Sequence, residues 1–248
     1  MLLLMLASCN FQDILDDATT TFEGLTNPLV VQGWYVGVAE PESDQIDLSG
    51  TDFDKGAALT VFLADAGNAN ELDKAPVSGA GVQADGVDLS EESDGAYTAS
   101  SDDGLTYTEG GDSLVSVQIG DGMAEATVLT PAAADANIPT TGALGANLTV
   151  DLSGQGFDNV LVVVLDMASA EMVWTNTPSD IKGVYDFATA DQVNSLTVPG
   201  AEAFAGSGVY AVGVAGMNKA DSDSFVDMNT ALSSVMAGKL RFYPYVIP

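Results

Sequence analysis

The sequence predicts an all-β fold of the β-sandwich type, on the evidence of its hydrophobic periodicity and its turn residues. In residues 115–119, Val and Ile alternate with Ser and Gln, and residues 124–128 alternate in the same way. Asp-Gly pairs separate such runs at residues 85–86, 94–95, 103–104 and 121–122. These pairs accept positive φ and favour tight turns, so they predict many short antiparallel strands packed in sheets.

Further apolar runs of the same kind occur along the whole chain. They cover residues 30–38, 59–63, 148–152, 173–174, 196–198, 209–214 and 240–246. Residues 160–165 are apolar throughout, which predicts a central strand buried on both faces. Pro244 predicts that the last strand lies at a sheet edge, because proline cannot donate to a strand ladder.

One segment has helical periodicity instead. Apolar residues at positions 228, 232, 235 and 236 recur at helical spacing. Asp227 precedes them as a candidate N-cap, and Gly238 follows them as a candidate C-terminal glycine. This pattern favours a helix over residues 227–238.

The predicted domain organisation depends on residues 131–139 (PAAADANIP), where two prolines and small residues interrupt the strand pattern. This composition predicts an interdomain linker. The expected parts are a signal remnant (1–8), a tether (9–28), an acidic sandwich domain (29–130), the linker (131–139) and a second sandwich domain (140–248). The tripeptide at residues 59–61 recurs at 148–150, which hints at duplication of one module.

The charge balance excludes some partners. The chain has 36 acidic and 6 basic residues, net −30, and 24 of the acidic residues fall in residues 1–130. Binding nucleic acid requires Lys and Arg to neutralise phosphates, so nucleic acid is not an expected partner. Because 46% of the residues are hydrophobic, the chain nevertheless has enough apolar surface to fold.

The N-terminus carries a location signal. Residues 1–6 are apolar, and the run Leu6-Ala7-Ser8-Cys9 resembles the lipobox of bacterial lipoproteins. The resemblance implies that Cys9 carries a lipid that anchors an exported chain in the cell envelope, at the outer membrane or cell surface. The run departs from that pattern because no Lys or Arg precedes Cys9, as expected if the reading frame begins upstream. The alternative is an unmodified cysteine in a short apolar N-terminus.

A second resemblance concerns the fold. Residues 77–82 (VSGAGV) and 95–97 (GAY) are similar to segments of immunoglobulin-like or prealbumin-like modules in secreted bacterial proteins. Taken with the anchor, this resemblance implies two tandem immunoglobulin-like β-sandwich domains after a short N-terminal lipid-anchored tether.

Enzyme chemistry is restricted by the residue types present. The chain has no histidine, and Cys9 is its only cysteine. Histidine-dependent nucleophilic catalysis and acid–base catalysis are therefore excluded. Residues 179–182 match the S-x-x-K pattern of penicillin-recognising enzymes but lack its companion motifs. The pair Asp166 and Glu171 keeps open a carboxylate-based carbohydrate hydrolase.

Two kinds of ligand site remain candidates, and Ca²⁺ is the one cofactor that the sequence suggests. Acidic residues cluster in two predicted loops, and these clusters suggest Ca²⁺ sites although neither fits an EF-hand. The first loop contains Asp44, Asp47, Asp52 and Asp54, and the second contains Asp221, Asp223 and Asp227. Trp174, beside a predicted loop, is a candidate stacking residue for a sugar, whereas Trp34 lies on the apolar face of its strand.

The functional hypothesis is a cell-envelope lipoprotein that acts as a non-catalytic binding or structural module, with a protein or glycan partner. The alternatives are a Ca²⁺-dependent adhesion or glycan-binding protein and the carboxylate-based hydrolase. The first is checked by calorimetric titration with Ca²⁺.

The net charge leads to a prediction about salt. Repulsion between carboxylates is screened within about 10 Å at 0.1 M salt and about 3 Å at 1 M. We therefore expect the Tm to rise markedly with NaCl concentration in a thermal melt. A Tm that stays flat across this range would show that repulsion does not control stability.

Overall fold

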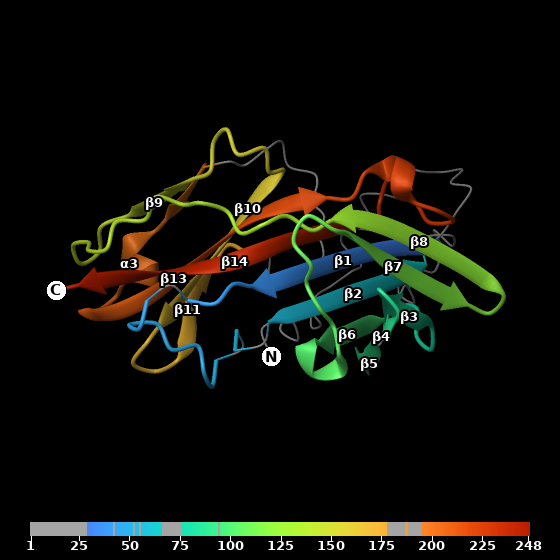
Figure 1. Cartoon of the computed structure of the whole chain (residues 1–248), viewed down its shortest axis with the longest axis horizontal. Helices are drawn as coiled ribbons and strands as arrows, with labels where there is room; N and C mark the ends of the chain where they lie inside the picture. Colours follow the sequence, from blue (N-terminus) through green and yellow to red (C-terminus); the bar gives the residue numbers. More distant parts are fainter. Residues whose placement is uncertain are drawn as a thin grey trace.

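The computed structural model describes residues 29–41, 43–51, 53–54, 56–65, 76–93, 95–177, 187 and 195–248 (Figure 1). These residues form fourteen strands, the four-residue helix α3 (Gly200–Ala203) and two short 3₁₀ turns, η3 (Ser101–Asp103) and η4 (Ser222–Ser224). The sheets pack against one another through buried apolar side chains. The predicted all-β class and sandwich packing are confirmed.

One sheet of eight strands runs through the molecule in the order β11-β10-β13-β14-β1-β2-β6-β5. Its strands are β1 (Leu29–Val38), β2 (Ala57–Asp65), β5 (Ser90–Ser93), β6 (Ala96–Ser100), β10 (Asn159–Asp166), β11 (Glu171–Thr175), β13 (Gly208–Lys219) and β14 (Ser234–Ile247). Four of them precede residues 131–139 and four follow, so the two predicted domains share this sheet. All its strand pairs are antiparallel except β1 and β14, which pair in parallel from Gln32↔Ser234 to Val38↔Leu240.

Two smaller sheets complete the described fold. A four-stranded sheet, in the order β4-β3-β7-β8, and a two-stranded sheet, β12-β9, lie over the central sheet (Figure 1). Their strands are β3 (Gly81–Ala84), β4 (Val87–Asp88), β7 (Asp112–Ile119), β8 (Gly122–Leu129), β9 (Leu148–Asp151) and β12 (Ser195–Val198).

Both smaller sheets cover the same face of the central sheet. In β14, Val235 and Ala237 face a core shared with the four-stranded sheet. Tyr245 and Ile247 have the same parity along β14, and they face a second core shared with β9, β12 and α3. Because side chains alternate between faces along a strand, these two cores lie side by side on one face.

The opposite face has a core of its own, covered in part by the connection between β1 and β2. Phe53 of that connection packs edge-on against Phe242, with ring centroids 5.4 Å apart, and Trp34 packs against Phe187 at 5.1 Å. The same face carries four buried oxygens without a hydrogen-bond partner in the described structure: Gln32 Oε1, Thr60 Oγ1, Asn159 Oδ1 and Ser234 Oγ. Each such group costs about 1–3 kcal/mol, so this face is the less completely satisfied of the two.

The helix predicted over residues 227–238 is wrong, because residues from Ser234 onward belong to strand β14. Val235 and Met236 are both buried, one on each face of the central sheet. A strand buried on both faces has no polar alternation, and its adjacent apolar residues imitated helical spacing.

The prediction that the last strand is an edge strand is also wrong for β14 as a whole, which lies between β13 and β1. However, the pairing of β14 with β1 ends at Leu240, which lies opposite Val38. The Ala39 N–H donates to Leu240 O, and this is the last backbone hydrogen bond that the β1 side makes with β14 before residue 244. Pro244 therefore occupies a part of β14 that has β13 on one side but not β1 on the other, where its missing donor costs little.

One of the predicted Asp-Gly turns has the expected backbone conformation, and a second is shifted by one residue. Asp85 and Gly86 have φ of 51° and 82°, and they join β3 to β4 by a tight turn. Between β7 and β8, the pairing Ile119↔Gly122 makes Gly120 and Asp121 the turn residues. Gly120, with φ of 58°, supplies the positive φ there, rather than the predicted Gly122.

The packing of β13 leads to a stability prediction. A Cβ at Gly213 would lie 2.6 Å from the Phe242 ring and 2.7 Å from Val163 Cγ2, whereas a Cβ at Gly208 meets nothing within 4 Å. Gly213→Ala should therefore lower the free energy of unfolding by about 1–3 kcal/mol through overpacking. Gly208→Ala, on the same strand, is the control and should change it by about 0.5 kcal/mol or less in denaturant titrations. Equal effects would contradict the packing.

Candidate functional site

Several predicted site residues lie outside the described residues: Cys9, Asp52 and the segment 179–182. The remaining acidic candidates are exposed. Asp44, Asp47 and Asp54 lie in the β1–β2 connection, and Asp221, Asp223 and Asp227 lie in and around η4. Within the described ranges, no three acidic or cysteine side chains converge in a way that would hold a metal ion.

Asp47 is instead part of a tight local turn. Its Oδ1 accepts hydrogen bonds from the Ser49 hydroxyl at 2.6 Å and from the Ser49 backbone N–H at 2.9 Å. These bonds lower the pKa of Asp47, with the hydroxyl as the larger cause. Since hydrogen bonding to the charged form favours ionisation, these bonds keep the carboxylate charged while it shapes the turn.

The same turn occurs in the second half of the chain. Asp151 Oδ1 accepts from the Ser153 hydroxyl at 2.5 Å and from its N–H at 2.9 Å, and the Asp151 pKa is lowered by the same causes. Residues 46–54 (IDLSGTDFD) and 150–158 (VDLSGQGFD) are identical at six of nine positions. This nine-residue repeat can be read from the sequence alone. It is longer than the tripeptide repeat at residues 59–61 and 148–150, and it supports the same hypothesis of duplication.

The proposed hydrolase pair is brought together, but at a turn. Asp166 and Glu171 are register partners across β10 and β11, at the two ends of the four-residue turn 167–170. Asp166 Oδ1 accepts the Ala168 N–H at 2.8 Å, so one of the two carboxylates helps to shape the turn. Like charges directly opposite each other on paired strands are destabilising, which favours a solvated position for both.

Trp174 lies in β11, opposite Val164. It is half-buried and packs against the core beneath β9, β12 and α3. Its ring therefore contributes to that core from the edge of the central sheet, while Trp34 is buried on the other face, as its strand position predicted.

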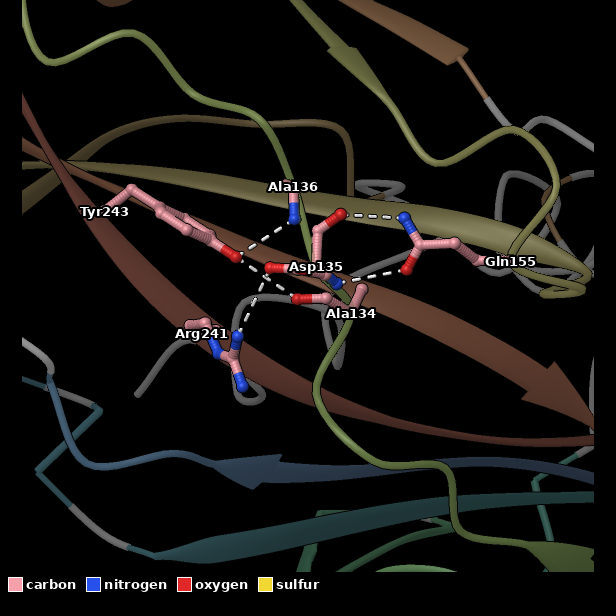
Figure 2. Close-up of polar contacts among 6 residues, drawn as sticks. All are labelled: Ala134, Asp135, Ala136, Gln155, Arg241 and Tyr243. Atoms are coloured by element: carbon pink, nitrogen blue, oxygen red, sulfur yellow. Dashed lines mark hydrogen bonds and ion pairs between the residues drawn. The ribbon is translucent and has the colours of Figure 1, made fainter.

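The predicted linker is fastened to the central sheet by polar contacts (Figure 2). Figure 2 shows the Tyr243 hydroxyl between two backbone groups: it donates to Ala134 O at 3.2 Å and accepts from Ala136 N–H at 3.0 Å. The Gln155 side chain pairs with both backbone groups of Asp135, at 2.7 and 3.1 Å. Ala134 and Ala136 are buried, so residues 131–139 pack against the sheet.

Tyr107 holds the start of the same segment. Its hydroxyl donates to Pro131 O at 2.9 Å, and its ring packs edge-on against Tyr35 at 5.1 Å. Burial raises the pKa of Tyr107, so the hydroxyl remains a neutral donor at physiological pH. These contacts fix the path of the chain where the segment begins.

Exposed apolar side chains gather on the β7–β8 hairpin. We call Leu114, Met123, Leu129 and Val226 the hairpin surface; each is 40–51% exposed. Leu114 faces Thr127 across the two strands and is therefore the diagonal neighbour of Leu129. Val226 forms an isolated bridge with Glu125 and extends this surface beyond β8.

The hairpin surface was not found from the sequence, although a signal existed. Alternation in β7 and β8 places polar residues on the outer face, as Ser116, Gln118 and Thr127 are. Leu114 and Leu129 occupy that same face with apolar side chains. Apolar residues at outward positions of an otherwise clean alternation mark a surface that another molecule can cover.

The two Asp-Ser turns lead to a pH prediction. Their carboxyl pKa values are lower in the folded chain than in the unfolded chain, so the resulting stability is present above the unfolded pKa and lost as pH falls through the folded one. Ser153→Ala should raise the Asp151 pKa toward its ordinary value in a carboxyl NMR titration and leave that of Asp47 unchanged. Ser49→Ala should do the reverse. Unchanged midpoints in both variants would contradict the hydrogen bonds.

Comparisons with known proteins give no family for this chain. No family model matches it, and no curated protein matches it. Among solved structures it is similar to the FN1–FN3 domains of chicken CNTN1, at 11% identity and a TM-score of 0.25, covering 89% of this chain and 66% of that one. It is also similar to a titin structure, at 11% identity and a TM-score of 0.21, covering 89% and 99%. Scores this low carry no argument about function.

Membrane-spanning helices are a separate question. Within the residues that the structure describes, no helix is long and apolar enough to cross a bilayer.

Proposed function

We propose that the protein is a non-catalytic binding module, held at a bacterial envelope membrane by lipid on Cys9. The observation that carries the anchor is the run Leu6-Ala7-Ser8-Cys9, placed after an apolar start and ahead of the β-sheet region. Several acyl chains on one cysteine provide stable attachment, because each buried CH₂ contributes about 0.8 kcal/mol.

The spacing of the chain supports this arrangement. Residues 10–28 separate Cys9 from Leu29, the first residue of β1. A chain spans at most about 3.3–3.6 Å per residue, so this stretch allows at most about 60–70 Å between the lipid and the sheet. That reach is sufficient for a strongly acidic module to stay clear of an anionic headgroup layer that repels it.

The residue chemistry supports a non-catalytic role. The sequence contains no histidine, and its only cysteine is the proposed lipid attachment point. The Tyr243 and Gln155 side chains spend their polar atoms on backbone groups of residues 134–136, which is a structural use. The hairpin surface supports binding, because exposed apolar side chains gathered on one rigid element favour contact with a partner.

The anchor is tested in the native host by metabolic labelling with a fatty acid and by detergent phase partition. The wild type should be labelled and enter the detergent phase, whereas Cys9→Ala should be unlabelled and remain in the aqueous phase. Ser8→Ala keeps a small residue before the cysteine, and as the control it should behave as the wild type does. An unlabelled wild-type protein with a free thiol would end this proposal.

A further inference from the structure

The hairpin surface is unusual in where its apolar side chains are. The described residues contain seven exposed large hydrophobic side chains, and four of them form this surface. Of the other three, Leu144 and Val173 lie on separate elements, and Ile119, at the end of β7, has the parity of its inner face. Single exposed apolar residues are normal on proteins, but a concentration on one hairpin and its neighbour requires a reason.

The β7–β8 hairpin is held in place by its packing against the central sheet. The inner face of β7 and β8 is buried against the central sheet through Val115, Val117, Ala124, Ala126 and Val128. Ser113, also buried, donates to Asp85 Oδ2 at 2.8 Å and ties the start of β7 to the β3–β4 turn. Leu114 and Leu129 are therefore presented by strands that packing holds in place.

The outer edge of β8 is already occupied. Glu125 and Val226 exchange both backbone hydrogen bonds, at 2.9 and 3.1 Å. The Ser224 hydroxyl donates to Thr127 O at 3.0 Å, and Asn218 Nδ2 donates to Leu129 O at 3.4 Å. A partner strand therefore cannot extend the sheet along this part of β8, so contact must be made through the outer face.

Carboxylates lie on the same elements as the apolar side chains. Asp112, Asp121 and Glu125 lie on the hairpin itself, and Asp221, Asp223 and Asp227 lie in the adjoining turn around Val226. Residues 112–129 and 220–233 contain no Lys or Arg. Electrostatic complementarity therefore requires a basic partner, and a second copy with net charge −30 would be repelled.

From this placement we infer that the hairpin surface binds a partner protein segment in which apolar and basic side chains alternate. The apolar side chains cover Leu114, Leu129 and Val226, and the basic ones meet the carboxylates on the same elements. Burial of apolar area supplies the affinity, while the charges steer the encounter and select the partner. This inference rests on the proposed binding function and names the chemistry of its partner.

The test uses the full chain and a synthetic peptide of alternating leucine and lysine, titrated by calorimetry. The wild type should bind, and affinity should fall with added NaCl because the carboxylate contacts are screened. Leu114→Ser combined with Leu129→Ser should weaken binding by about tenfold or more, and Asp112→Asn combined with Glu125→Gln should weaken it and flatten the salt dependence.

Val173→Ser is the matched control, since Val173 and Leu114 are each 40% exposed and Val173 lies on β11. Its affinity should stay within about twofold of the wild type. Equal affinity in all variants would overturn the inference, because attraction would then come from the net charge alone. No wild-type binding, or self-association that the leucine variants abolish, would also overturn it.

The outcome is separable from that of the anchor. Peptide binding is measured by calorimetry and lipid attachment by labelling, on different residues. An unlipidated chain that still binds the peptide through Leu114 and Leu129 would refute the anchor and leave this surface standing.

Discussion

The parallel pairing of β1 with β14 is the interaction on which the architecture depends. It joins the first described strand to the last, with Gln32 opposite Ser234 and Val38 opposite Leu240. On one side of this seam lie β2, β6 and β5, and on the other lie β13, β10 and β11. Without it, each half would expose a strand with unpaired backbone groups at the centre of the molecule, which is a costly arrangement.

The seam also decides how the cores are arranged. Because β14 runs through both halves, one of its faces supplies Val235 to one core and Ile247 to another. Its other face supplies Met236 and Phe242 to the core beneath the β1–β2 connection. The four unpartnered oxygens lie on that second face, and Gln32 and Ser234 are opposite each other at the first pair of the seam. The seam is thus well packed but imperfect in its hydrogen bonding.

Local rules in the sequence predicted local structure well. Period-two alternation located β7 and β8, and the continuous apolar run 160–165 located β10, which is buried on both faces. The same rules failed at β14, where burial on both faces removed the alternation and Val235-Met236 resembled a helix. They also could not show that residues on the two sides of the 131–139 segment share a sheet, because strand partners distant in sequence leave no periodic signal.

The candidate site was predicted less well than the fold, for a related reason. The number of acidic residues predicted Ca²⁺ sites but could not show the local turn in which Asp47 accepts two hydrogen bonds from Ser49. The hairpin surface depends on which side chains share a face and which charges adjoin them across the chain. Leu114 and Leu129 are fifteen positions apart, and Val226 follows Leu129 by 97 positions. Only the fold places them together.

The position of β14 has a consequence for biogenesis. Its residues, 234–247, are the last of the described strands to leave the ribosome, and they are needed by both halves of the central sheet. The pairs among β1, β2, β6 and β5 can form before β14 is made, but the eight-stranded sheet cannot be completed until this last strand joins its two halves.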